Sequence, residues 1–132
     1  MKIGIIGSKG FIGNNLNFYF NKRSNYKIFN FSSFNKYKNK WIKKICNEIK
    51  INKPDIIINC AANQNLYDDK KAVKELFNSN LYSNIMFLNQ SVKNKNFKGY
   101  ISFGTKWEFD SNLNYNPLNF YAATKNANDV FF

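Results

Sequence analysis

One stretch decides the fold of this 132-residue chain: Lys2-Ile3-Gly4-Ile5-Ile6-Gly7-Ser8-Lys9-Gly10-Phe11-Ile12-Gly13. Its first half is a short apolar, β-branched run that Gly7 closes, which is typical of a buried strand. Its second half places glycines at positions 7, 10 and 13 and leads into apolar residues at mostly helical spacing. The stretch therefore predicts a strand, a tight glycine turn and an amphipathic helix in direct succession.

Each position of the turn needs glycine for a different physical reason. The first allows a tight turn with unusual dihedral angles. The second lets a diphosphate approach the backbone, and the third lets the helix pack closely on the sheet. The amino end of the helix offers free N–H groups and a partial positive charge to the diphosphate. We therefore predict a dinucleotide site that comprises Gly7, Lys9, Gly10, Phe11, Ile12 and Gly13.

The rest of the chain alternates strands and helices without a repeat or a linker. Strands are expected at 2–6, 26–31, 55–60 and 99–103. Helices are expected from 11 to 21 or 23, from 41 to just before Pro54, from 70 to 92, and from about 119 onward. The apolar side of the third helix is expected to carry Ala72, Val73, Leu76, Phe77, Leu81, Ile85 and Leu88. A loop is expected over 104–117.

This alternation predicts an α/β fold, a Rossmann-like doubly wound parallel sheet with strand order 2-1-3-4. The continuous apolar run at 55–60 is typical of a parallel strand that is buried on both faces. Residues 1–132 are expected to form one nucleotide-binding domain that stops after its last helix. Ligands of such sheets bind beyond the carboxyl ends of the strands.

The end of the second strand bears on the choice of cofactor. Folds that prefer NAD place an acidic residue there, about 20 residues after the glycines, whereas this chain has Asn30, Phe31, Ser32 and Ser33. The absence of a carboxylate leaves room for the 2′-phosphate of NADP, which Ser32, Ser33 and Lys36 or Lys38 would bind. Both NAD and NADP stay open, with a slight preference for NADP.

Tyr121-Ala122-Ala123-Thr124-Lys125 sets a tyrosine and a lysine one helical turn apart on one face. An ammonium about 5 Å from the phenol, at an effective dielectric of about 20, would contribute roughly 3 kcal/mol. We therefore expect Lys125 to lower the pKa of Tyr121, making it an acid/base catalyst, and to hold the ribose of the cofactor. Thr105, at the end of the preceding strand, is expected to donate a hydrogen bond to the substrate oxygen.

Composition favours an ordinary soluble domain over other classes. The net charge of +12 suggests a nucleic-acid partner, but all basic residues except Arg23 are lysines spread along the chain, so we expect none. Membrane association is not expected, because no apolar run nears the roughly 20 residues that a bilayer span needs, and a cytoplasmic location follows by default. Cys46 and Cys60 lack metal-site spacing, so no metal is expected, and Cys60 is expected to be a buried thiol.

Four segments, taken in order, resemble the extended short-chain dehydrogenase/reductases, the NAD-dependent epimerase/dehydratase superfamily. They are Ile6 to Gly13, Lys53 to Ala62, Gly104-Thr105-Lys106-Trp107, and Asn116-Pro117 through Tyr121 to Lys125. The last is similar to the N-P-x-x-x-Y-x-x-[ST]-K stretch of nucleotide-sugar epimerases and reductases. The resemblance implies Thr105, Tyr121 and Lys125 as catalytic residues. It also implies that Ala61 and Ala62 line the cofactor cleft, and it matches Asn80 to a helical asparagine whose role is structural.

The resemblance further implies an NAD(P)-dependent epimerase, dehydratase or reductase whose substrate is a nucleotide-linked sugar. Proteins of this kind continue into a sugar-binding domain and can form homodimers, so we interpret this chain as an amino-terminal fragment of such a protein. The alternative is a catalytically silent nucleotide-binding or regulatory fragment. The motifs imply the reaction of the whole enzyme, while the fragment alone is expected to be inactive.

Overall fold

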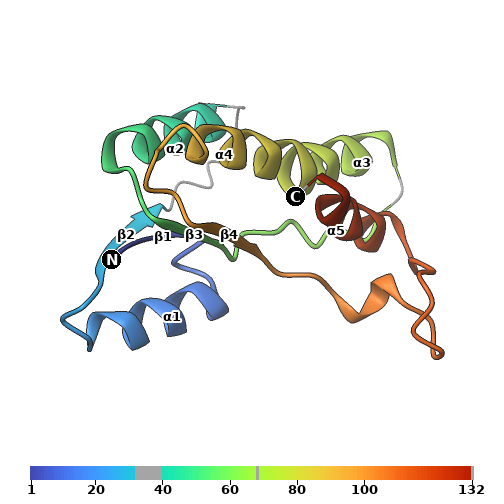
Figure 1. Ribbon diagram of the computed structural model, residues 1–132. Coiled ribbons are helices and arrows are strands. Elements are labelled where there is room, and N and C mark those ends of the chain that lie inside the picture. Colours follow the sequence, from blue (N-terminus) through green and yellow to red (C-terminus); the bar gives the residue numbers. More distant parts are fainter. Residues whose placement is uncertain (32–39, 68, 132) are drawn as a thin grey trace. The chain divides into compact units, whose positions relative to one another are not determined.

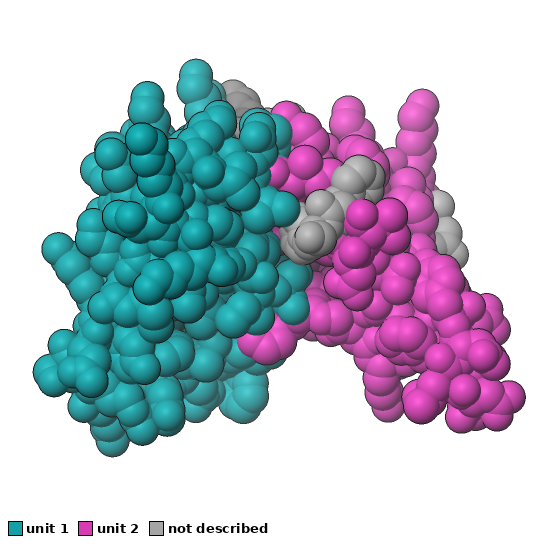
Figure 2. All heavy atoms as spheres, in the orientation of Figure 1, with its two compact units in different colours: residues 1–61, 86–102 teal, residues 62–85, 103–132 magenta. Residues whose placement is uncertain are grey.

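The computed structural model describes residues 1–31, 40–67 and 69–131. The chain divides into two compact units, shown in teal and magenta in Figure 2. The first comprises residues 1–61 and 86–102, and the second comprises residues 62–85 and 103–132. The two units are described in turn.

The first unit contains the predicted parallel sheet. Its strands are β1 (Lys2–Ile6), β2 (Lys27–Phe31), β3 (Ile56–Asn59) and β4 (Gly99–Ser102), in the order β2-β1-β3-β4. All three neighbouring pairs run parallel, and Ile3 of β1 is in register with Ile28 on one side and Ile56 on the other. The expected strand order is therefore confirmed.

Helices cover both faces of this sheet. Helix α1 (Phe11–Asn21) lies on one face, and α2 (Lys40–Asn52) lies with the end of α4 (Ser83–Ser91) on the other (Figure 1). Neighbouring residues Ile5 and Ile6 point to opposite faces and are both buried, as expected for a strand covered on both sides. The core of the α2 face comprises Ile6, Phe31, Ile42, Ile45, Ile49, Ile57 and Phe87.

Helix α2 ends where the sequence predicts. Its apolar residues Ile42, Ile45 and Ile49 recur at helical spacing and are all buried. Lys53 then takes a left-handed conformation with φ of 48°, and its N–H donates to the carbonyl of Ile49 at 2.9 Å. Pro54 follows, and because proline disfavours helix at the preceding residue, the helix ends here.

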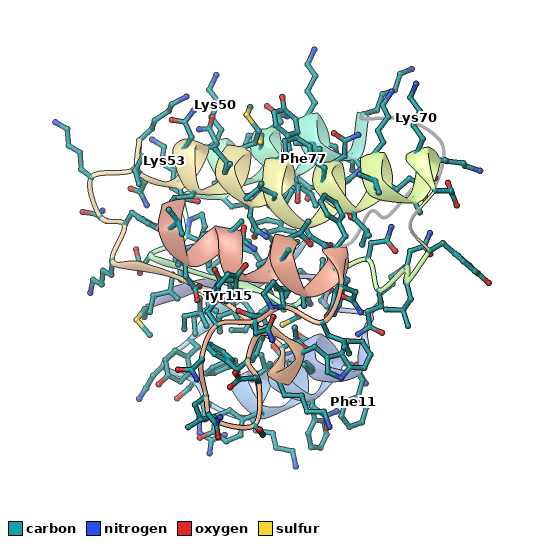
Figure 3. All side chains as sticks on the ribbon, turned by 90° about the vertical axis from the view of Figure 1, so that its right-hand side faces the viewer. Phe11, Lys50, Lys53, Lys70, Phe77 and Tyr115 are labelled. Carbon is teal, nitrogen blue, oxygen red and sulfur yellow. The ribbon has the colours of Figure 1, made fainter. Side chains whose placement is uncertain are left out.

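The long helix expected over 70–92 is present from Lys70 to Ser91, but its middle is π-helical, which the sequence did not predict. Helix α3 (Lys70–Leu76) leads into a π-helical turn, η1 (Phe77–Tyr82), before α4 begins. The wider turn shifts the helix face, so Phe77, expected on the apolar side, is exposed (Figure 3), while Asn80 is buried. Hydroxyl groups favour the irregularity, because Ser79 and Ser83 each donate to a carbonyl four residues earlier.

Helix α1 forms as expected but presents aromatic residues to solvent. Phe11 is 87 % exposed and Phe18 is 63 % exposed, and Phe11 projects from the start of the helix in Figure 3. Only Gly13 is fully buried among the residues of α1. The closest approach of this helix to the rest of its unit is at this glycine, and Phe20 adds a ring contact with Tyr26 at 5.2 Å between centroids.

The second unit contains α3, η1, a short 3-10 helix η2 (Lys106–Glu108) and α5 (Phe120–Phe131). The loop expected over 104–117 thus includes one helical turn. An isolated antiparallel bridge between Phe109 and Tyr115 closes the rest of that loop. Leu113 makes the tight turn in it, with φ of 62°.

Candidate functional site

The glycine turn follows β1 directly and packs against the end of β3. Gly7 has φ of +76°, and its N–H donates to the carbonyl of Phe31 at 3.1 Å. A β-carbon on Gly7 would lie 2.8 Å from the backbone nitrogen of Ala61. Glycine is thus required here by both conformation and space.

The amino end of α1 is left open for an anion. Gly10 precedes the helix in an extended conformation and provides no side-chain cap, and the first turn of α1 has no acidic residue. A β-carbon on Gly10 would meet only the Gly7 oxygen, at 3.4 Å. Because the first N–H groups of a helix have no partner within it and carry a partial positive charge, this end fits a diphosphate.

The other residues predicted to bind the cofactor have different surroundings. Lys9, Phe11 and Ile12 are exposed. Ala61 is half-buried against Gly7, and Ala62 is half-buried in the second unit. Ser32, together with Ser33, Lys36 and Lys38, lies outside the described residues.

Two residues that the sequence did not single out support the end of β3. The side chain of Asn59 accepts a hydrogen bond from the N–H of Ala61 at 3.0 Å. The same side chain hydrogen-bonds the phenol of Tyr100 on β4. Burial raises the pKa of Tyr100 well above its ordinary value, and the bond to Asn59 lowers it by less. Asn59 therefore links β4 to the backbone that packs against the glycine turn.

Helix α5 carries the predicted tyrosine and lysine. It begins after Asn119, whose side chain accepts from the N–H of Ala122 at 2.9 Å, as a helix-capping residue does. Tyr121 is 6 % exposed and Lys125 is 5 % exposed. Because residues four apart share a helix face, the phenol and the ammonium are both on the inner face of α5.

The surroundings of Tyr121 correct one expectation. The pKa of Tyr121 is raised, first by burial and then by the negative charge of Glu108, while a hydrogen bond from Gln64 acts in the opposite direction. The pKa of Tyr121 is therefore raised, whereas the sequence predicted that it is lowered. The Trp107 ring lies edge-on to the Tyr121 ring, with centroids 6.1 Å apart, and contributes to the burial that favours the neutral phenol.

Asn80 connects two chain segments to α5. Its side chain donates to the carbonyl of Asn63 at 2.9 Å and accepts from the N–H of Asn63 at 2.8 Å. It also donates to the Thr124 hydroxyl at 3.3 Å, and this hydroxyl donates to the carbonyl of Tyr121 at 2.8 Å. Asn80 thus holds the segment that bears Gln64 next to the helix turn that bears Tyr121.

Thr105 is the residue before η2, and its backbone and side chain are both engaged. Its N–H donates to a carboxylate oxygen of Glu108 at 2.5 Å, and its hydroxyl oxygen accepts a long hydrogen bond from the N–H of Trp107 at 3.5 Å. The hydroxyl hydrogen is not used in this pair, so Thr105 can still donate to a substrate oxygen. Thr105, Tyr121 and Lys125 all belong to the second unit.

Sequence reasoning missed Gln64, Glu108, Asn59 and Tyr100. For Glu108 a signal exists, because Thr105-Lys106-Trp107-Glu108 follows the T-x-x-E pattern of a capping box. Gln64, Asn59 and Tyr100 have no local pattern, because their partners are distant in the sequence.

The described ranges contain neither a candidate metal-binding cluster nor a candidate membrane span. There, no group of three or more His, Cys, Asp or Glu side chains is placed to hold a metal ion. No helix in the same ranges is long and apolar enough to cross a bilayer. Cys60 is half-buried rather than buried as expected, and neither it nor Cys46 forms a disulfide.

Comparison with known proteins agrees with these features. The model of the NAD-dependent epimerase/dehydratase family matches residues 3–131. No curated protein sequence matches the chain.

Solved structures share the fold at low sequence identity. UDP-glucose 4-epimerase of Thermotoga maritima, solved with UDP-glucose, matches 99% of the chain at a TM-score of 0.82 and 15% identity. A dTDP-4-dehydrorhamnose reductase of Bacillus anthracis in complex with NADP matches 98% at a TM-score of 0.79 and 24% identity. WbmH of Bordetella bronchiseptica in complex with NAD+ matches 98% of the chain at a TM-score of 0.77 and 18% identity. The chain covers 50%, 48% and 50% of these proteins, about half the length of each.

Proposed function

The chain belongs to the NAD-dependent epimerase/dehydratase family, and on this premise we propose that it serves an NAD(P)-dependent epimerase, dehydratase or reductase of nucleotide-linked sugars. The observation that carries the proposal is the buried Tyr121 and Lys125 pair on α5, with Thr105 and Trp107 in the adjoining turn. The open amino end of α1 supports the cofactor half of the proposal.

Each residue has a distinct role in the proposed reaction. The backbone from Gly7 to Gly13 binds the cofactor diphosphate, and Lys125 binds the nicotinamide ribose. The Thr105 hydroxyl donates a hydrogen bond to the reacting sugar oxygen, and the Tyr121 hydroxyl gives a proton to that oxygen or takes one from it. A bound nicotinamide supplies the hydride donor or acceptor.

The proposal includes a slight preference for NADP over NAD. It rests on the absence of an acidic residue among Asn30, Phe31, Ser32 and Ser33, since a carboxylate there would repel a 2′-phosphate. Titration of the protein with NADH and NADPH, followed by the fluorescence of the reduced nicotinamide, decides the point. Tighter binding of NADH would remove this preference.

A second candidate function is a nucleotide-binding or regulatory module without turnover. The open amino end of α1 supports nucleotide binding in either case. Binding of nicotinamide cofactors with no conversion of any sugar nucleotide, in the longest available form of the protein, would favour this second function.

The main experiment measures binding and turnover in the same preparation. The protein is titrated with NADH and NADPH, then incubated with UDP-, dTDP- and CDP-linked sugars while nicotinamide absorbance and sugar products are followed. Tyr121→Phe is the matched control, since it removes only the phenolic oxygen. A folded protein that binds no nicotinamide cofactor would contradict the proposal. We also propose that the full-length protein is a homodimer, and its oligomeric state is measured in the same preparation.

A further inference from the structure

The net positive charge of this chain belongs to its first unit. Among the described residues, the first unit has 13 basic and two acidic side chains, whereas the second unit has five of each. The lysines that are spread along the sequence are therefore unevenly placed in the fold. Like charges that gather on a small unit repel one another, and an anionic partner that covers them relieves this repulsion.

Within the first unit, basic side chains line the edge of the sheet at which the strands begin. Three connections reach this edge, namely residues 22–27 before β2, 50–55 before β3 and 92–98 before β4. They lie on the left in Figure 1, beside the amino-terminal end of β1. The exposed basic side chains of these segments, together called the basic edge, are Lys2, Lys22, Arg23, Lys27, Lys50, Lys53, Lys93, Lys95 and Lys98.

Backbone hydrogen bonds join these segments side by side. The carbonyl of Met1 accepts from the N–H of Lys27 at 2.9 Å. The carbonyl of Lys2 accepts from the N–H of Asp55 at 2.9 Å, and the carbonyl of Asp55 accepts from the N–H of Lys98 at 2.7 Å. The basic edge is thus one continuous surface across all four strands.

The basic edge has almost no counter-charge of its own. Asp55 is the one acidic residue in its segments, and its Oδ2 accepts from the backbone N–H of Lys2 at 2.8 Å. In the described part of the chain, none of the nine basic side chains forms an ion pair with a carboxylate. The surface therefore offers its positive charge to a partner outside the unit.

The glycine turn does not use this charge. It follows the carboxyl end of β1 (Lys2–Ile6), whereas the basic edge lies at the amino ends of the strands. At about 3.3 Å per residue, the length of β1 separates the two edges by roughly 15 Å. The partner of the basic edge is therefore distinct from the cofactor proposed for the turn.

Exposed aliphatic side chains lie among the lysines of the basic edge. Ile51 is 68 % exposed, Val92 is 57 % exposed and Met1 is 46 % exposed. Lysines attract anionic headgroups, and aliphatic side chains that enter the headgroup region leave water. This combination is typical of a protein surface that binds an anionic bilayer without crossing it.

Nucleic acid fits the same surface less well. Bases stack on open aromatic rings, but the rings beside the basic edge are covered by cations. The Lys22 ammonium lies 4.0 Å from the centroid of the Phe18 ring, and the Arg23 guanidinium lies 3.5 Å from that of Tyr19. Base edges are read mainly by arginine forks, and Arg23 is the one arginine among nine basic residues.

We propose that the basic edge docks the first unit on an anionic lipid surface, with Ile51 and Val92 entering the headgroup region between the lysines. The sequence argues against a bilayer span, and peripheral binding does not need one. The inference goes beyond the proposed function and does not depend on it, because the opposite edge of the sheet is used.

Cosedimentation with lipid vesicles tests the role of the charge. The wild type should bind vesicles of equal parts phosphatidylserine and phosphatidylcholine, should not bind phosphatidylcholine alone, and should be released by salt. Each basic residue near such a surface contributes about fivefold in affinity. Combined replacement of three exposed lysines by glutamine should therefore lower the affinity on the order of 100-fold; the replaced residues are Lys50, Lys93 and Lys95.

The matched control removes the same charge from the second unit. It replaces the exposed lysines of α3, Lys70, Lys71 and Lys74, by glutamine. Because these residues lie outside the basic edge, the affinity should change by at most about threefold. Equal losses in the two triple variants would overturn the proposal, and far-ultraviolet circular dichroism confirms that each variant is folded.

A variant without aliphatic side chains separates lipid from nucleic acid. Ile51→Gln combined with Val92→Gln keeps every charge and should lower vesicle affinity about tenfold, while any binding of a single-stranded DNA oligonucleotide stays unchanged. No binding to the anionic vesicles would overturn the proposal. Oligonucleotide binding that needs the three lysines, with vesicle binding indifferent to the aliphatic pair, would also overturn it and assign the edge to nucleic acid. Cofactor titration is a separate readout, so failure of the proposed function is seen independently.

Discussion

Gly13→Ala and Gly10→Ala add the same methyl group three residues apart, and we expect a large loss of stability from the first and almost none from the second. A β-carbon at Gly13 would lie 2.3 Å from the Gly7 oxygen and 2.8 Å from the Ser8 α-carbon. At Gly10 the nearest atom is the Gly7 oxygen at 3.4 Å, and the backbone, with φ of −75° and ψ of 170°, suits any residue. Gly13 therefore has no room for a methyl group, and Gly10 has.

The magnitudes follow from these contacts. At Gly13 the clash is with backbone atoms and is about 1 Å inside ordinary contact, so overpacking costs about 3 kcal/mol. The better helix propensity of alanine returns up to about 1 kcal/mol. The free energy of unfolding should fall by about 2 to 3 kcal/mol, and Tm by roughly 8 to 12 °C for a chain of this size. Gly10→Ala loses some capping and gains chain stiffness, and should stay within about 1 kcal/mol of the wild type.

Urea unfolding followed by far-ultraviolet circular dichroism gives both free energies by linear extrapolation. The wild type and the two variants are measured in one buffer without nucleotide, so that only folding is compared. If Gly13→Ala proved as stable as Gly10→Ala, the inference that α1 packs against the glycine turn without room for a methyl group would be refuted.

Three further predictions concern binding, catalysis and pH. Gly10→Val should leave the fold largely intact and abolish NAD(P)H binding, because the side chain fills the place of the diphosphate; fluorescence titration that found wild-type affinity would exclude this assignment. In the full-length protein, Tyr121→Phe should cut turnover by about 10²-fold or more with little change in cofactor affinity, whereas Lys125→Ala should reduce both, and near-wild-type turnover of Tyr121→Phe would reject the acid/base role. Burial raises the pKa of Tyr100 in the folded protein, so above about pH 10 the unfolded chain loses the phenolic proton while the folded chain keeps it. The free energy of unfolding therefore falls by up to about 1.4 kcal/mol for each pH unit in this range. Tyr100→Phe should reduce that slope in urea titrations from about pH 10 to 12, and equal slopes would contradict the burial of this phenol.

Local sequence patterns predicted the framework of the first unit and the chemistry of its motifs. The glycine turn, the strand at Ile56–Asn59 and the strand order follow from local patterns, since a residue's neighbours in sequence set both its backbone freedom and its helical or extended periodicity. The spacing of Tyr121 and Lys125 likewise placed both on one face of α5, because four residues make about one helical turn.

The electrostatic surroundings of these groups depend on tertiary contacts. The pKa of Tyr121 is raised rather than lowered, because burial and the negative charge of Glu108 outweigh the hydrogen bond from Gln64, and these effects come from other segments of the chain. Asn80 is buried in the π turn, where its side chain hydrogen-bonds Asn63 and Thr124. Such effects depend on which distant side chains share a small buried volume, and periodicity in sequence carries no information about those partners.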